Sequence, residues 1–192
     1  VRYGEDPGEQ LCTDDFAGHL AHNVNLAAKA IVGVACYGRL TGEKVWEDKA
    51  KDMASRLLVT IGTRGDTPLT LDGKGWSMKY NLLWDKVLKL GLLPEAFYEA
   101  ELRRYLPRIN RYGLPLDSRA DYTKSDWICW VAAMAEDMQT RQALLEPIAR
   151  MLEETSSRVA FTDWYDTKTG RYRHFIARSV QGGVFAPMLR ML

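Results

Sequence analysis

The chain contains 192 residues, which is enough for one domain or at most two small ones. Its 26 Lys and Arg residues nearly balance its 25 Asp and Glu residues, so the charge does not point to a nucleic acid or an anionic membrane surface as partner. No apolar run approaches the ~20 residues of a membrane-spanning helix. The cysteines Cys12, Cys36 and Cys129 are far apart and form no CxxC pair, which argues against a zinc site or a disulfide framework built on cysteine.

The first half of the chain has the apolar periodicity of helices. Thr13 is a candidate N-cap, and Asp14 and Asp15 suit the positive end of a helix dipole. Apolar residues from Leu20 to Ala35 then recur at helical spacing. A Gly- and Pro-rich stretch farther on predicts a long loop, a type that is often functional in a compact domain. The elements expected here are a loop over 1–12, helices over about 13–40 and 44–61, a loop over 62–75 and a helix over about 78–90.

The second half adds more helices and one short β-hairpin. Pro94 is placed to begin a helix, and Pro107 is expected to end or kink it. Aromatic and β-branched residues on both sides of a turn at 166–170 predict the hairpin. Successive helices with short links indicate an all-α fold of antiparallel helical hairpins, as an array, a bundle or a toroid. The elements expected here are helices over about 94–110, 125–137 and 141–154, a connector over 111–121, the hairpin over 159–176 and a last helix over about 177–192.

One group of candidate site residues belongs to the first predicted helix. On a continuous helix, Asp15, His19 and His22 would share one face, opposite the apolar stripe. Three interpretations are open for this face. It is a polar site that faces a substrate, or a helix start capped by Asp14 and Asp15 with partly exposed histidines, or a metal site made of one carboxylate and two imidazoles. No second motif corroborates a metal site, so no metal is expected.

The second half contributes two candidate acids. The TKSD motif that ends at Asp126 has the spacing of a capping box, so Asp126 either caps a helix or faces a substrate beside Trp127. Asp163 lies next to Trp164, and apolar neighbours would raise the pKa of a general acid or base there; a turn-capping role is the alternative. Arg178, near the start of the last helix, suits a substrate carboxylate.

Five stretches, taken together and in this order, resemble the glutaminase A family of large secreted microbial and fungal proteins. They cover nearly the whole chain, and they are specific in combination although each alone is weak. The stretches are CTDDFAGHLAHNVNLAAKAIVG (12–33), KYNLLWDKVL (79–88), RYGLPLDSRADYTKSDWICW (111–130), FTDWYDTKTG (161–170) and ARSVQGG (177–183).

The resemblance implies that residues 1–192 form a single helical domain, the C-terminal half of an (α/α) toroid of helical hairpins in a larger parent chain. It implies a secreted or periplasmic parent that hydrolyses L-glutamine to L-glutamate and ammonia without a cofactor. The expected partners are a small-molecule substrate, glutamine or a sugar, and the remaining domains of the parent. The alternatives are a carbohydrate-cleaving enzyme, by analogy with toroidal glycoside hydrolases that use two carboxylates, and a non-catalytic helical scaffold.

No catalytic residue is carried over from the family, so the site is predicted from the residues. We expect polar groups at the starts of three helices and on the hairpin to meet in one cleft, with an acidic residue as general acid or base. The predicted catalytic residues are Asp15, Asp126 and Asp163. The predicted substrate-binding residues are Asp14, His19, His22, Asn23, Trp127, Trp164 and Arg178.

Overall fold

A computed structural model describes residues 3–62 and 68–191. These residues contain six α-helices (α1 to α6), four 3-10 helices (η1 to η4) and two short strands (β1 and β2), which confirms the prediction of a helical fold with one small β element. The chain divides into two compact units, Val1–Glu95 and Ala96–Leu192. Part of the predicted long loop, 63–67, and Leu192 at the end of the last predicted helix lie outside the described residues. In the described part of the chain, each helix is too short or too polar to cross a bilayer.

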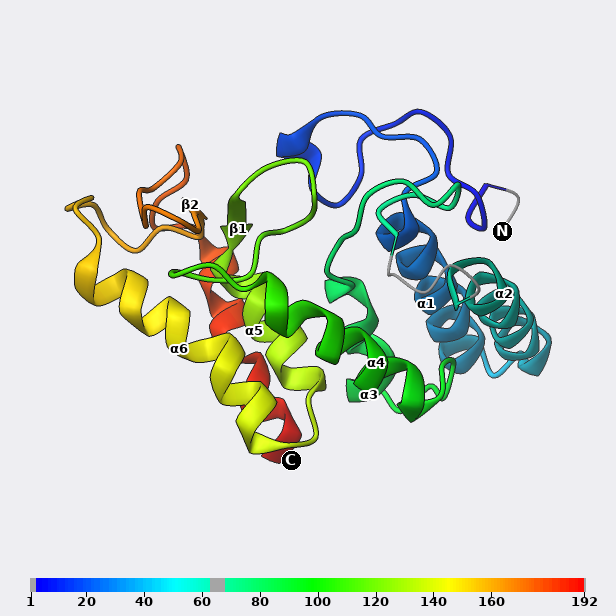
Figure 1. Cartoon of the computed structure of the whole chain (residues 1–192). Coiled ribbons are helices and arrows are strands. Elements are labelled where there is room, and N and C mark those ends of the chain that lie inside the picture. The colour runs from blue at the N-terminus through cyan, green and yellow to red at the C-terminus, as the bar shows by residue number, and fades with distance from the viewer. Residues whose placement is uncertain (1–2, 63–67, 192) are drawn as a thin grey trace. The chain divides into compact units, whose positions relative to one another are not determined.

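The first unit is built on a helical hairpin. Its helices α1 (Val24–Thr41) and α2 (Lys44–Gly62) lie side by side in Figure 1. Each buries a stripe of apolar residues at helical spacing, and Ile31 on α1 and Leu57 on α2 are examples. Gly42 ends α1 with a φ of 73° and donates its N–H to a carbonyl of the last turn. This hairpin matches the predicted order of a long helix, a Gly break and a second helix.

The first helix begins at Val24, and the prediction that it begins at Thr13 is wrong. His22 has a φ of 61°, which a continuous right-handed helix does not permit. Asn23 is extended, and its side chain caps α1 by accepting the N–H of Leu26 at 2.9 Å. Helical spacing alone does not reveal where α1 begins. The break lies in the backbone of polar residues, and these residues do not interrupt the apolar stripe.

A buried lysine precedes the short helices that follow. The helix predicted over 78–90 is replaced by η2 (Tyr80–Leu82) and α3 (Leu83–Val87). Lys79 is fully buried, and its Nζ donates to a loop carbonyl at 2.9 Å and to the carbonyl and hydroxyl oxygens of Ser77 at 2.8 and 2.7 Å. The ammonium group therefore has neutral oxygen partners that hold the preceding loop against the helix start.

The second unit contains the helices from α4 onward. Pro107 is confirmed as a helix end, because α4 stops at Tyr105 and a 3-10 turn follows. Asp137 caps α6 by accepting the N–H of Thr140 at 2.7 Å, so α6 begins before Arg141, where the sequence pattern placed it. η4, red in Figure 1, packs along α5. The bounds are α4 Glu95–Tyr105, η3 Leu106–Arg108, α5 Ser125–Met134, α6 Met138–Glu154 and η4 Ser179–Met191.

A two-stranded antiparallel sheet joins distant parts of the second unit. β1 (Tyr122–Lys124) pairs with β2 (Trp164–Asp166), so that Lys124 lies opposite Trp164. The predicted turn after β2 is present, and Gly170, with a φ of 70°, donates its N–H to the carbonyl of Asp166 at 2.8 Å. The turn was therefore placed correctly, but the second strand of the predicted hairpin is only an isolated bridge between Tyr165 and Tyr172, and the strand partner of β2 is β1, just before α5. This pairing brings the residues before β2 to the start of α5.

Buried aromatic packing holds β2 in place. Tyr165 is fully buried in a cluster with Tyr112 and Met151, and its hydroxyl donates to the carbonyl oxygen of Tyr112 at 2.9 Å. Gly113, with a φ of 146°, permits this approach, because an added Cβ would lie 2.9 Å from Ile128 Cδ1 and 3.1 Å from the Tyr165 hydroxyl. β2 is thus fixed against both α5 and α6.

Candidate functional site

A buried group of charged residues gathers at the start of α5. Lys124 is the last residue of β1, and Asp126 lies in the first turn of α5. Asp163 immediately precedes β2, and its carbonyl oxygen accepts the N–H of Ser125 at 3.0 Å. Arg178 immediately precedes η4. Strand pairing and the packing of η4 on α5 therefore assemble a cluster from three separate stretches of the chain, which we call the Lys124 cluster (Lys124, Asp126, Asp163 and Arg178).

Asp163 is the centre of the Lys124 cluster. Its Oδ2 accepts hydrogen bonds from Lys124 Nζ and from the Nη2 of Arg178, and its Oδ1 lies 3.3 Å from the Nε of Arg178. Asp126 Oδ1 lies 3.3 Å from Lys124 Nζ on the other side. The side chains of Lys124, Asp126 and Asp163 are 2%, 4% and 0% exposed, whereas that of Arg178 is 38% exposed. The cluster therefore reaches the surface at Arg178.

The two carboxyl groups have pKa values that move in opposite directions. Burial raises the pKa of Asp126, and the nearby ammonium of Lys124 offsets part of that rise. Burial also acts to raise the pKa of Asp163, but the hydrogen bonds from Arg178 and Lys124 outweigh it and leave the pKa below its usual value. Two carboxyl groups whose pKa values differ in this way suit acid–base catalysis, because the group with the higher pKa can give a proton while the group with the lower pKa stays ionised.

Aromatic rings enclose the cations of the cluster. Lys124 Nζ lies 5.1 Å from the centre of the Trp127 ring, and the guanidinium carbon of Arg178 lies 3.7 Å from the centre of the Phe175 ring. Trp164 is half-buried and contacts Phe175 with a ring-centre distance of 4.9 Å. Trp127 and Trp164 thus belong to the surroundings of the cluster, and Trp127 is buried.

The capping-box interpretation of Asp126 is not what the structure shows. The N-cap of α5 is Lys124, and no side chain makes a capping hydrogen bond there. β1 draws Thr123 and Lys124 into the sheet, so Thr123 does not take the N-cap position that a capping box requires. The turn-capping alternative for Asp163 is wrong as well, because its carboxylate binds Lys124 and Arg178.

A glycine on η4 allows that helix to cover Asp126. A Cβ added at Gly183 would lie 2.8 Å from the Asp126 Cβ and 2.8 Å from the Trp130 Nε1. Gly182, the preceding residue, has no heavy atom within 4 Å of the equivalent position. The ARSVQGG stretch therefore contains one glycine that packs tightly against the cluster and one that does not.

We expect Gly183→Ala to destabilise the protein by about 1–3 kcal/mol, because the added Cβ would clash with the Cβ of Asp126 and with the Trp130 ring, so that η4 must shift away from α5. Gly182→Ala is the matched control and is expected to change the free energy of unfolding by less than about 0.5 kcal/mol. Urea unfolding of both variants measures the difference. Equal unfolding midpoints would contradict the close packing of η4 on α5.

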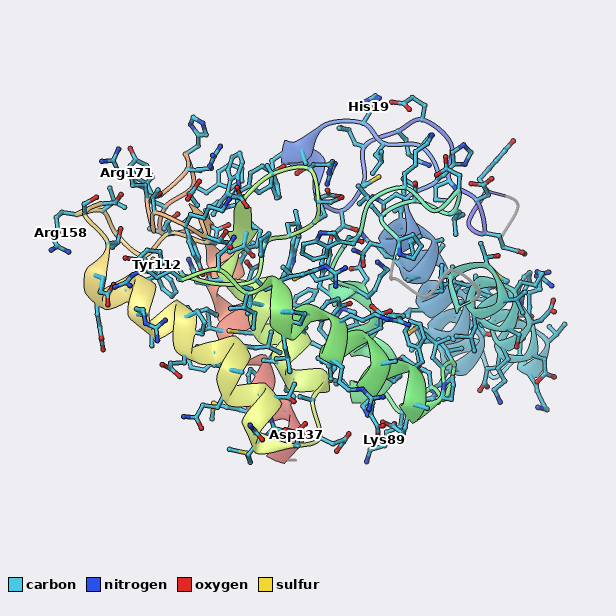
Figure 2. All side chains as sticks on the ribbon, viewed as in Figure 1. His19, Lys89, Tyr112, Asp137, Arg158 and Arg171 are labelled. Carbon is cyan, nitrogen blue, oxygen red and sulfur yellow. The ribbon has the colours of Figure 1, made fainter. Side chains whose placement is uncertain are left out.

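The first unit places the two histidines in exposed loops, and the predicted helical face does not exist. Asp15 begins the 3-10 turn η1 (Asp15–Ala17) and is exposed. His19 is exposed, and Figure 2 shows its side chain pointing away from the ribbon. The Nδ1 of His22 lies 2.6 Å from Oδ1 of Asp6, which accepts the hydrogen bond of the protonated imidazole and so raises the pKa of His22. Asp15, His19 and His22 therefore do not share the face of one continuous helix.

Asp14 and Asn23 are the buried members of the same predicted group. Asp14 is 3% exposed and precedes η1 without a side-chain capping bond. Asn23 is 1% exposed and acts as the N-cap of α1, which gives it a structural role. Among the described residues, no group of three or more His, Cys, Asp and Glu side chains is arranged to hold a metal ion.

The structure thus brings together Asp126, Asp163 and Arg178 from the predicted site, all in the second unit. Asp15 and His19 belong to the first unit, and their predicted convergence on the same cleft stays a prediction. Lys124, the residue that links both carboxyl groups, was not predicted as a site residue. The one available signal was its position two residues before Asp126 in the same motif.

A family model and two known proteins each match nearly the whole chain. The family model described as the glutaminase A six helical-hairpin domain matches residues 1–188. The chain is 37% identical over 199 residues to Glutaminase A of Aspergillus oryzae (strain ATCC 42149 / RIB 40), which covers 95% of the chain and 29% of that protein. It is 32% identical over 226 residues to the probable glutaminase/05536 of Arthroderma benhamiae (strain ATCC MYA-4681 / CBS 112371), which covers 97% of the chain and 26% of that protein. The chain therefore spans less than a third of the length of either relative.

Proposed function

Because the chain belongs to the family of the glutaminase A six helical-hairpin domain, we propose that it is part of the catalytic domain of an enzyme that hydrolyses L-glutamine to L-glutamate and ammonia. Two relatives with glutaminase in their names support this reaction over a carbohydrate substrate. Since the chain spans 29% of the first relative, the activity is proposed for a complete protein that includes this domain. The proposed setting is an (α/α) toroid of helical hairpins in a secreted protein, completed by the other domains of that protein.

The observation that carries the proposal is the pair of buried carboxyl groups joined by Lys124. Hydrolysis of a carboxamide needs a base that takes a proton from the attacking water and an acid that gives a proton to the departing nitrogen. Asp163, the ionised member, is assigned as the base, and Asp126, the member with the raised pKa, is assigned as the source of the proton. The proton balance then closes, because one carboxyl group gains the proton that the other loses.

Arg178 is the proposed contact with the substrate. Its side chain is the exposed end of the Lys124 cluster, and its Nε and Nη2 edge is bound to Asp163. A substrate carboxylate that binds this edge in a bidentate manner takes the guanidinium from Asp163. Asp163 then keeps Lys124 as its cation partner, loses one of the two groups that lower its pKa, and becomes a stronger base as the substrate arrives.

Ammonia release tests the proposed function. The complete protein is expected to release ammonia from L-glutamine, and the 192-residue chain alone to release little or none, because a cleft at the centre of a toroid takes its walls from both halves. The two proteins are assayed at equal molar concentration with an enzyme-coupled ammonia assay. Full activity of the 192-residue chain would show that the site is complete within it. An inactive complete protein would remove the support for a glutaminase.

A further inference from the structure

Lys124 contacts both carboxyl groups, but the two groups are not equivalent. Asp163 binds Lys124 and also Arg178, whereas Asp126, among the described residues, has its ion pair with Lys124 alone. We propose that Asp126, and not Asp163, is the first of the two carboxyl groups to take up a proton as the pH falls, and that Lys124 is a positioning residue whose charge delays this protonation to a lower pH. The role of this proton in catalysis rests on the proposed function, but its location does not.

The position of the ammonium group is fixed from several sides. The side chain of Lys124 is 2% exposed, and its Nζ lies 5.1 Å from the centre of the Trp127 ring and 6.0 Å from that of Phe175. The backbone of Lys124 is held by the pairing of β1 with β2, opposite Trp164. A buried ammonium with such neighbours does not turn to solvent, so its charge stays beside both Asp126 and Asp163.

The pKa shifts of Asp126 and Asp163 agree with these ion pairs. Burial raises the pKa of Asp126, and Lys124 is the cation that limits the rise. Burial also acts on Asp163, but Arg178 and Lys124 together lower its pKa. If Lys124 loses its charge, Asp126 loses the cation that opposes burial, while Asp163 keeps Arg178.

Several charged or titratable groups on the elements packed against the cluster stay neutral or have partners of their own. On α5, burial raises the pKa of the Cys129 thiol to about 12, so this neighbour of Asp126 stays neutral. The described side chains of η4, residues 179–189, include no charged group. On α6, which packs on α5, three charged side chains have partners elsewhere: Arg141 with the carbonyl of Ala135, Arg150 with Glu146, and Glu154 with Arg111.

The test removes the charge and keeps the length of the side chain with Lys124→Met in the complete protein. Aspartate carboxyl carbons labelled with ¹³C are followed by NMR as the pH is changed, and Asp126→Asn and Asp163→Asn assign the two signals. We expect the pKa of Asp126 to rise by about one unit or more, and that of Asp163 to rise less. In parallel, the pH at which kcat falls to half should move in the same direction as the Asp126 titration.

Lys79→Met is the matched control, because Lys79 is equally buried but has oxygen partners in Ser77 and a loop carbonyl. It is expected to lower the melting temperature and to leave both carboxyl titrations unchanged. The proposal is overturned if Lys124→Met behaves like Lys79→Met, with lower stability and unchanged titrations. Shifted titrations together with normal turnover in Asp126→Asn would uphold the proton placement and reject the proposed catalytic role.

A second variant applies if Lys124→Met does not fold. Arg178→Gln removes the exposed cation of the cluster and leaves Lys124 as the cation shared by both carboxyl groups. We expect the pKa of Asp163 to rise and that of Asp126 to stay nearly constant, with Asp126 still the first to protonate. A larger shift at Asp126 than at Asp163 would overturn the proposal.

Discussion

Asp126→Asn is expected to lower kcat for glutamine hydrolysis by about 100-fold or more in the complete protein, without loss of stability. Asparagine has nearly the shape of aspartate but cannot serve as the carboxylic acid that gives up a proton. The carboxyl group that it replaces is 4% exposed and has a pKa raised by burial, so its ionised form is costly in the folded state. The substitution removes that cost, and Lys124 keeps Asp163 as its partner.

The effect of Asp126→Asn on stability depends on pH, and the raised pKa of Asp126 sets the direction of that dependence. A carboxyl group whose pKa is raised in the folded state stabilises the fold below its unfolded pKa, and that stability is lost as the pH rises through the folded pKa. The gain in stability of Asp126→Asn over the unchanged protein should therefore be largest at neutral pH and smaller under acid conditions. Steady-state ammonia release and urea unfolding measure the two effects separately. Near-normal turnover with reduced stability would assign Asp126 a structural role.

The sequence was a good guide to the helices that apolar residues define. The hairpin of α1 and α2, the end of α4 near Pro107 and the turn after β2 all follow from local signals that the tertiary structure does not override. The start of α1 was missed because it depends on the backbone of His22 and on the cap at Asn23, and both residues are compatible with a helical pattern.

The site was predictable in part, and the missing part has a physical cause. Asp126, Asp163 and Arg178 were identified because acids and a cation stood beside aromatic residues or near helix starts. Lys124 was missed because its role arises from the pairing of β1 with β2, two segments far apart in the chain. No local pattern reports a pairing of this kind, and the capping-box spacing at Asp126 favoured a different interpretation.

In the first unit, the sequence predicted a group of site residues that the backbone does not bring together. Two of the three histidines of the chain, His19 and His22, made this segment attractive as a site, because helical spacing would place them on one face with Asp15. The actual backbone leaves both histidines exposed and pairs His22 with Asp6. The clustering of titratable residues in sequence therefore carried less information than their position relative to buried strands and helix starts.

Asp163→Asn is expected to cost about 3–5 kcal/mol of stability, because it breaks a buried ion pair. The change leaves Lys124 buried next to a neutral amide and takes away the bidentate partner of Arg178. Turnover is expected to fall by about 100-fold or more as well, because the proposed base is gone. Unlike Asp126→Asn, this variant should therefore show both defects, and urea unfolding with steady-state kinetics on the folded fraction distinguishes them.

The pH dependence of the Asp163→Asn effect has the opposite sign to that of Asp126→Asn. A carboxyl group whose folded pKa is lowered stabilises the fold above its unfolded pKa, about 4, and this stability is lost as the pH falls through the folded pKa. The difference between the unchanged protein and Asp163→Asn should thus be full near neutral pH and shrink under acid conditions. Asp121→Asn is the matched control, because Asp121 pairs with Lys168 at 2.7 Å where the two side chains are 47% and 61% exposed. Surface pairs of this kind are screened by solvent and contribute little, so a loss in Asp163→Asn no larger than in Asp121→Asn would show that the buried cluster does not hold β2 and η4 against α5.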